Sequence, residues 1–138
     1  MNREDIVALV REILAEGTAV CPVKLRRLPE INVTEHDRLD TGDSSHSVYT
    51  HDVLSLEKSP RLGAGIMEMA KTTFPWELNY DEIDYVIKGS LTIYYGETAV
   101  TAGEGELIFI PKGSKILFSA PDFARFLYVT YPADWQKQ

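Results

Sequence analysis

The segments EIDYVIKG (residues 82–89) and GELIFIPKG (residues 105–113) decide the fold. The first separates a glutamate from a glycine by six residues, and the second separates a glycine from Pro-x-Gly by five. The gap between them suits a hairpin and one further strand. Short apolar or alternating runs, with Gly and Pro between them, surround both segments and are typical of an antiparallel sandwich or barrel.

The β signal covers the chain from about Val48 onward. Turn signals stand between the runs, for example Lys88-Gly89 and Ala120-Pro121-Asp122. The runs predict strands at 53–56, 65–70, 83–87, 91–95, 98–102, 106–110, 115–119 and 125–131.

The N-terminal part has the periodicity of an amphipathic helix over residues 4–15. Its apolar stripe consists of Ile6, Leu9, Val10, Ile13 and Leu14, and Gly17 is the predicted end. Residues 35–47 are polar and typical of a loop. We therefore divide the chain into a helix (1–17), a linker with the first strand (18–47) and a barrel (48–138).

Composition argues against several classes of protein. With 21 acidic and 14 basic residues, the chain has a net charge of −7 and no visible basic face for nucleic acid. No apolar run approaches the ~20 residues that cross a membrane, and the N-terminus does not read as a secretion signal. The single cysteine, Cys21, suits a reducing compartment such as the cytoplasm.

The two opening segments resemble the signature motifs of the cupin superfamily, which implies an all-β fold with a single jelly-roll barrel. That family normally carries His-x-His before the glutamate, whereas residues 74–82 read FPWELNYDE. A further histidine is expected where this chain has Ile116. Of the usual metal ligands only Glu82 remains, so we expect no Zn, Fe, Ni or Cu and no metal-dependent oxygenase chemistry.

A longer set of residues resembles the EutQ family of ethanolamine-utilization proteins. The matching segments are FPWELNYDEIDYVIKG (74–89), GELIFIPKGS (105–114) and RFLYVTYPADW (125–135). The family belongs to bacterial operons that degrade ethanolamine inside protein-shelled microcompartments. Some members are credited with acetate kinase activity, which converts acetate and ATP into acetyl phosphate and ADP.

The resemblance also implies partners and a location. The helix over residues 1–17 resembles the short encapsulation peptides that carry enzymes into microcompartments, so we expect it to bind the shell or a pathway enzyme. Jelly-roll barrels leave sheet edges that need covering, and cupins commonly pair through them, so we expect a homodimer. The expected location is the cytoplasm, in association with the microcompartment.

Glu82 and Asp84 are the predicted catalytic residues. They lie two apart on a strand and share a face, so both point into the barrel if Glu82 does, as the cupin pattern implies. Two carboxylates in a partly dry cavity repel each other, so either one keeps a proton or a cation lies between them. The expected cation is Mg²⁺, with Glu77 as a third ligand unless that glutamate is simply solvated.

Five residues are candidates for binding the substrate. Trp76 and Tyr80 precede the Glu82 strand and would wall a pocket, although core packing is nearly as good an interpretation of Trp76. Lys112 lies beside Gly113 in a tight turn, which is either a phosphate site or an ordinary exposed turn.

The last two candidates lie on opposite faces of residues 125–131. Phe126, Tyr128 and Thr130 share one face, and Arg125 lies on the other. The pattern leaves open which face lines the cavity. Tyr128 would offer a hydroxyl to a ligand, and Arg125 would hold an anion or form a salt bridge at the rim.

Three functions compete on this sequence. A phosphoryl transferase needs a metal and a basic side chain near the phosphates, and the chain has no recognisable nucleotide motif. A non-catalytic module would bind a small amine such as ethanolamine through carboxylates and aromatic rings, or assist assembly of the microcompartment. A sugar isomerase or epimerase needs a base such as histidine in the barrel, and none is visible.

Overall fold

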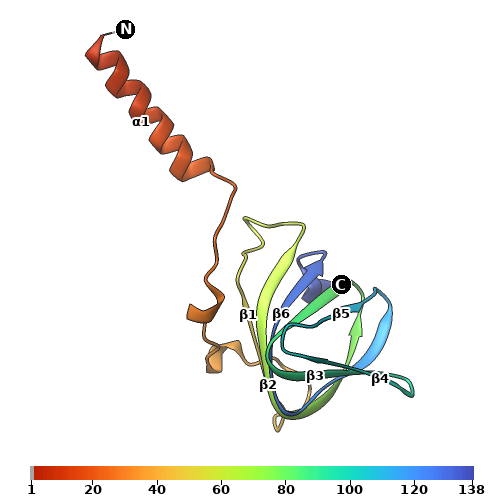
Figure 1. Ribbon diagram of the computed structural model, residues 1–138. Coiled ribbons are helices and arrows are strands. Elements are labelled where there is room, and N and C mark those ends of the chain that lie inside the picture. The colour runs from red at the N-terminus through yellow and green to blue at the C-terminus, as the bar shows by residue number, and fades with distance from the viewer. Residues whose placement is uncertain (1) are drawn as a thin grey trace.

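Six strands form one antiparallel sheet in the order β1-β2-β6-β3-β4, with β5 paired to β3 (Figure 1). The computed structural model describes residues 2–138, except the side chains of residues 13–20. The strands are β1 (Ser47–Asp52), β2 (Gly63–Leu78), β3 (Asp81–Tyr95), β4 (Thr98–Gly103), β5 (Leu107–Ile110) and β6 (Ser114–Tyr131). The helical elements are α1 (Arg3–Val20) and the short 3₁₀ turns η1 (Leu28–Glu30), η2 (Glu35–Asp37) and η3 (Trp135–Lys137).

The three long strands bend, and the bends wrap the sheet around one core. The first half of β3 pairs with β5 and its second half with β4. Register shifts interrupt the pairing of β3 with β6 around Gly89, whose φ of 78° suits a residue without a side chain. Another shift separates Ala70 from Thr72 in β2. The bulges let one strand contribute to both ends of the barrel.

The core lies between the inner faces of these strands. Alternate residues of β3 and β6 are buried, as expected for strands with one face on a core. Within this core, the largest fully buried apolar side chains are Phe74, Phe118, Phe126, Met69, Leu78, Leu91, Val48 and Val86.

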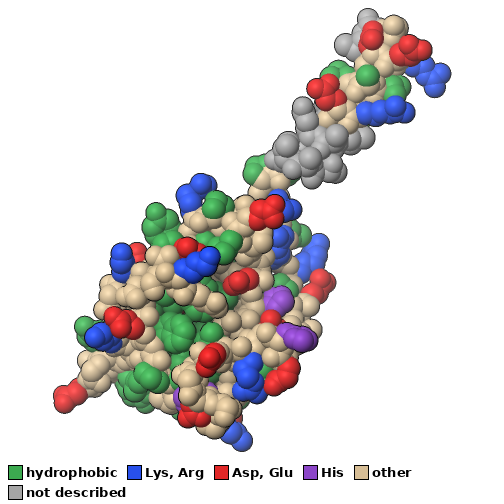
Figure 2. All heavy atoms as spheres, turned by 180° about the vertical axis from the view of Figure 1, so that it is seen from behind, with side chains coloured by type: hydrophobic (Ala, Val, Ile, Leu, Met, Phe, Trp, Pro, Cys, Tyr) green, Lys and Arg blue, Asp and Glu red, His purple; other side chains and the backbone are tan. Residues whose placement is uncertain are grey.

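The helix stands apart from the barrel, and an extended segment connects the two (Figures 1 and 2). The Asn2 side chain accepts a hydrogen bond from the Asp5 backbone and begins the helix with a capping box. Ile6, Leu9 and Val10 of the predicted stripe are 44–50% exposed, whereas the side chains of Ile13 and Leu14 lie outside the described residues. No helix in the described range is long and apolar enough to span a membrane.

The structure corrects four boundaries predicted from the sequence. The helix continues through Gly17 to Val20, and Cys21 ends it in an extended conformation. Residues 53–56 form a turn because pairing of β1 with β2 ends at Asp52. The predicted breaks at Lys88-Gly89 and at 120–122 are bulges within continuous strands.

Candidate functional site

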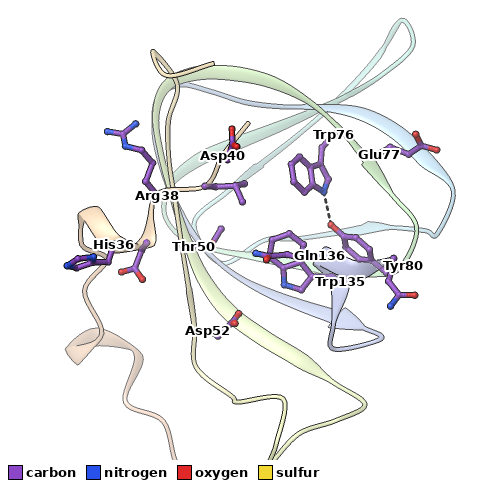
Figure 3. Close-up of a pocket in the computed structure, with 13 residues that line it drawn as sticks. His36, Arg38, Asp40, Thr50, Asp52, Trp76, Glu77, Tyr80, Trp135 and Gln136 are labelled. Carbon is purple, nitrogen blue, oxygen red and sulfur yellow. Dashed lines mark hydrogen bonds between the residues drawn. The ribbon is translucent and has the colours of Figure 1, made fainter. Parts of the chain in front are cut away.

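A pocket of about 580 Å³ opens at the mouth of the barrel, and we call it the vestibule (Figure 3). Its volume falls within the range of about 300–1,000 Å³ that is usual for ligand pockets. It is lined by residues 36–40 of the N-terminal segment, by Thr50 and Asp52 of β1, by Trp76 and Glu77 of β2, and by Tyr80, Trp135, Gln136 and Gln138.

The N-terminal segment forms one wall of the vestibule because several contacts hold it on β1. Arg38 donates to the His46 carbonyl at 2.8 Å, to the Tyr49 hydroxyl at 2.7 Å and to Glu35 at 3.1 Å. Asp37 lies 3.0 Å from the ring of His51. The Arg38 guanidinium consequently points away from the vestibule (Figure 3). The acidic residues Asp37 and Asp40 are among the residues that line this wall.

A second cavity, which we call the inner cavity, lies beneath the vestibule and measures about 10 Å³. It is lined by Leu39, Met67, Phe74, Trp76, Tyr80, Glu82, Phe118, Tyr128 and Trp135. Leu39, Trp76, Tyr80 and Trp135 line both cavities and form the partition between them. The Trp76 indole donates to the Tyr80 hydroxyl at 2.7 Å, which holds this partition together (Figure 3).

Glu82 and Asp84 both point into the barrel. They alternate with exposed residues on β3, and their exposed fractions are 4% and 0%. Glu82 lines the inner cavity, whereas Asp84 lies deeper in the core. In the described part of the chain, four buried side-chain oxygens lack a hydrogen-bond partner: Glu82 Oε2, both Asp84 carboxyl oxygens and Thr130 Oγ1. They cluster because Glu82 pairs with Thr130, and Asp84 with Tyr128, across β3 and β6.

Burial shifts the protonation of this carboxyl pair. Loss of solvation raises the pKa of Glu82 to about 7, and the neighbouring Asp84 carboxyl group opposes part of that shift. Burial also raises the pKa of Asp84 well above its usual range, and the negative charge of Glu82 raises it further. Asp84 is therefore the protonated member of the pair near neutral pH.

Phe126, Tyr128 and Thr130 lie on the inner face of β6. The sequence alone left open which face of this strand lines the cavity. The Tyr128 hydroxyl donates to Asp52 at 2.8 Å and so connects the inner cavity with the vestibule. Burial, followed by the nearby Asp52 charge, raises the pKa of Tyr128. Gly65 makes room for the ring, because a Cβ there would overlap the Tyr128 hydroxyl.

Three candidate residues lie away from the barrel interior. Glu77 is exposed and points outward from β2 (Figure 3), so it does not join Glu82 and Asp84 as a metal ligand. Arg125 lies on the outer face of β6, where it pairs with Glu68 at 3.0 Å and donates to two backbone carbonyls.

Lys112 also lies outside the vestibule. Its backbone N–H donates to Asp81, and the Gly113 N–H donates to the Leu78 carbonyl. These contacts leave no phosphate-binding nest in the turn.

The residues that the sequence analysis missed come from segments distant in the chain. Asp52 ends β1, Asp40 lies in a stretch predicted as loop, and η3 carries Trp135 to the barrel mouth. No local pattern marks Asp40 or Asp52. Trp135, however, was part of the ending that resembles the EutQ family.

The structure gives no sign of the usual cupin metal site among residues 2–138. Ile116 is buried in the core, and the ring of His46 packs near Phe74, with the centroids 6.2 Å apart. Among the side chains that the structure describes (residues 2–12 and 21–138), there is no cluster of three or more His, Cys, Asp or Glu with the geometry of a metal site.

Comparison with known proteins identifies the family. The family described as "Ethanolamine utilisation protein EutQ" matches residues 3–137. The chain is 65% identical to a Clostridioides difficile protein named "Acetate kinase EutQ", over 100% of this chain and 96% of that protein.

Solved structures agree with this result. The structure of the Clostridium difficile EutQ protein superimposes with a TM-score of 0.84 at 61% identity, over 86% of this chain and 87% of that one. The cupin domain of Schizosaccharomyces pombe Cnp3 has a TM-score of 0.59 at 14% identity, over 78% and 68% of the two chains, which supports the fold alone. The chain therefore has a cupin fold and belongs to the EutQ family of ethanolamine utilisation proteins.

Proposed function

We propose that this chain is an acetate kinase of ethanolamine utilisation, which transfers a phosphoryl group between ATP and acetate in the vestibule. The observation that carries the proposal is the 65% identity, along the whole chain, with the relative named acetate kinase. The vestibule supports it as an open pocket of ligand size at the barrel mouth.

Charge decides how a nucleotide would enter this site. The vestibule presents Asp37, Asp40 and Asp52, and Arg38, the one Lys or Arg among its described lining residues, points away. Such a surface repels a free polyphosphate. The nucleotide would therefore bind together with Mg²⁺, which is commonly held by one or two carboxylates, substrate phosphates and water.

The donor set fits Mg²⁺ in the vestibule and not in the inner cavity. Asp52 lines the vestibule, and one of its carboxylate oxygens accepts from the Tyr128 hydroxyl, which leaves the other oxygen for a cation. Asp40 lies at the other end of the vestibule, as Figure 3 shows. The inner cavity has room for about one water-sized group, whereas Mg²⁺ usually keeps several waters. We therefore move the proposed Mg²⁺ site from Glu82, Asp84 and Glu77 to Asp52, with the substrate phosphates and water as the remaining ligands.

The protein residues would position the reactants and keep bulk water away. Mg²⁺, when bound, would neutralise charge on the phosphates. Acetate is already an ionised nucleophile, so the transfer itself needs no general base. Trp76 and Trp135 offer apolar walls to the substrates, and the Tyr128 hydroxyl fixes the orientation of Asp52.

Acetyl phosphate formation tests this proposal. The purified chain, from a host strain that lacks its own acetate kinase, is assayed with acetate, ATP and Mg²⁺ and compared with a mock preparation. We expect turnover that requires Mg²⁺ and falls at least tenfold in Asp52→Asn, because a metal ligand loses its charge. Asp122→Asn is the matched control, since Asp122 is exposed and lines neither cavity.

Two outcomes would reject the proposal. Turnover no higher than in the mock preparation would leave a non-catalytic binding or assembly module as the better interpretation. Equal activity of Asp52→Asn and wild type would remove the vestibule as the active site.

We also propose that residues 1–17 bring the cytoplasmic protein to a bacterial microcompartment. The supporting observation is that Ile6, Val7, Leu9 and Val10 are 40–50% exposed on a helix that stands apart from the barrel. An unpaired apolar stripe of this kind fits a groove on a partner protein.

A further inference from the structure

We propose that the inner cavity binds an ammonium group, as the free ion or as the head of a small primary amine. This inference is independent of the proposed kinase activity, because it concerns a different cavity and a different ligand charge. It follows from the size of the cavity, its aromatic lining and the unpaired carboxylate oxygen in its wall.

Size limits the ligand to a group about as large as a water molecule. The cavity measures about 10 Å³, and one water needs roughly 10–15 Å³ of such space. An ammonium ion is close to water in size. A larger amine would have to extend its chain through the partition into the vestibule.

The lining has the composition of an aromatic cage. Six of the nine lining side chains are aromatic: Phe74, Trp76, Tyr80, Phe118, Tyr128 and Trp135. Trp135 meets Trp76 and Tyr128 edge-on, with ring centroids 6.0 Å apart in both pairs. Aromatic cages recognise ammonium groups because the negative ring faces attract a desolvated cation.

Glu82 supplies the matching charge. Its side chain is 4% exposed, lines the cavity and has one oxygen, Oε2, without a partner. No Lys, Arg or His is among the described residues that line this cavity. A buried carboxylate without a counter-ion is costly, and a bound cation with N–H donors would remove both the charge and the missing hydrogen bond.

The same contacts disfavour a metal ion in this cavity. Metal ions such as Ca²⁺ and Mg²⁺ need several oxygen ligands. The Tyr80 hydroxyl already accepts from Trp76, and the Tyr128 hydroxyl donates to Asp52. Glu82 alone then offers an unengaged oxygen in the cavity wall, whereas the remaining surface suits N–H groups and cation–π contact.

Binding should displace a proton from the carboxyl pair. The titratable groups that face Glu82 are Asp84 on the same strand, Tyr128 on β6 and Tyr80 at the partition. When Glu82 is protonated, an entering ammonium ion takes the place of that proton, which leaves to solvent. Affinity should therefore rise with pH below about 7, by up to tenfold per pH unit, and level off above it.

Intrinsic fluorescence tests the proposal on the full chain, because both tryptophans of the sequence, Trp76 and Trp135, line the cavity. Ammonium, methylammonium and ethanolamine chlorides are titrated against NaCl and KCl at constant ionic strength. We expect a saturable change with one or more ammonium compounds and none with the metal salts. The tightest compound distinguishes the free ion from an amine head group.

Variants assign the response to the carboxylate. Glu82→Gln should weaken binding at least tenfold, and Glu97→Gln, at an exposed turn, should match wild type. The pH profile of wild type tests the same point if Glu82→Gln does not fold. An unchanged fluorescence signal, an equal response to KCl, or an affinity that is flat between about pH 5 and pH 7 would each overturn the proposal.

Discussion

At the scale of single residues, the buried carboxyl pair is the least usual feature of the barrel. Glu82 and Asp84 lie in a core without a basic partner among the described residues, and three of their four carboxyl oxygens lack a hydrogen bond. Protonation relieves most of this cost, because a neutral carboxyl group needs less solvation. The pair therefore makes the stability of the barrel depend on pH.

The sign of this dependence follows from the direction of the shift. The pKa of Glu82 is raised from 4.5 to about 7, so the folded state holds the proton more tightly than the unfolded state. Its contribution to stability is complete below about pH 4.5 and is lost as pH rises to about 7. At about pH 8, the free energy of unfolding of Glu82→Gln should therefore exceed that of wild type by on the order of a few kcal/mol.

Urea unfolding at steps from about pH 5 to about pH 8 checks this prediction. The free energy of unfolding should fall less steeply with pH in Glu82→Gln than in wild type. In the exposed control Glu97→Gln, its dependence on pH should match that of wild type. Equal slopes in wild type and Glu82→Gln would show that Glu82 ionises normally in the folded barrel.

At the scale of elements, β6 serves two surfaces at once. Its inner residues build the cavity, and Arg125 on its outer face fastens the N-terminal segment to the barrel. Arg125 donates to Glu68 at 3.0 Å and to the carbonyls of Leu28 and Ile31 at 2.8 Å each. One planar guanidinium thus joins β2, β6 and η1.

Arg125→Lys should loosen this junction. Lysine keeps the charge but cannot reproduce the fixed set of N–H donors, so one or more carbonyls lose their partner. We expect a loss of about 1–3 kcal/mol in urea unfolding and faster proteolysis between residues 21 and 34. Lys115→Arg is the control for an Arg/Lys exchange away from this junction, because Lys115 is exposed near the other end of β6 and pairs with Glu77 of β2. Unchanged proteolysis in Arg125→Lys would mean that other contacts hold the segment.

Helix α1 should be dispensable for folding and required for location. Because the helix ends at Val20, deletion of residues 1–20 should leave the thermal unfolding of the barrel unchanged. The deletion should abolish association with purified microcompartments, whereas Glu12→Gln, on the same helix, should keep it. A lower unfolding temperature would show that the helix packs on the barrel in solution.

At the scale of the whole molecule, the outer face of the sheet carries an apolar patch. Ile83 lies between Phe109 and Val129 on neighbouring strands, and Tyr85 lies between Leu107 and Leu127. Tyr85, Leu107 and Phe109 are 42–58% exposed. Contiguous exposed apolar surface of this kind is typical of a protein–protein interface.

We predict that two copies pack through this patch as a homodimer. Light scattering at micromolar concentration should give twice the mass of the chain, and Phe109→Asp should give a folded monomer because it places a charge in the interface. Asp122→Asn should remain a dimer. A monomeric wild type would refute the prediction. If Phe109→Asp remains a dimer, the interface does not include this patch.

The sequence by itself determined the fold, the family and the fact that Glu82 and Asp84 share one face of β3. The spacing of Glu82 and Gly89 with the later Pro-x-Gly marked the cupin barrel, and the family comparison confirmed it. Alternation along a strand placed Glu82 and Asp84 on one face, because neighbouring side chains point to opposite sides of a sheet. The helix was also predicted, although not its last turn.

Only the tertiary structure decided which face of β6 is inside and which segments meet at the barrel mouth. Both faces of β6 are largely apolar, so the local pattern could not separate Tyr128 from Leu127. Asp52, residues 36–40 and Trp135 meet because β1, the N-terminal segment and η3 converge on the end of the barrel. That convergence depends on long-range strand pairing and on bulges such as the one at Gly89. A local sequence pattern records the conformation of each segment, but not the partner that closes the barrel over it.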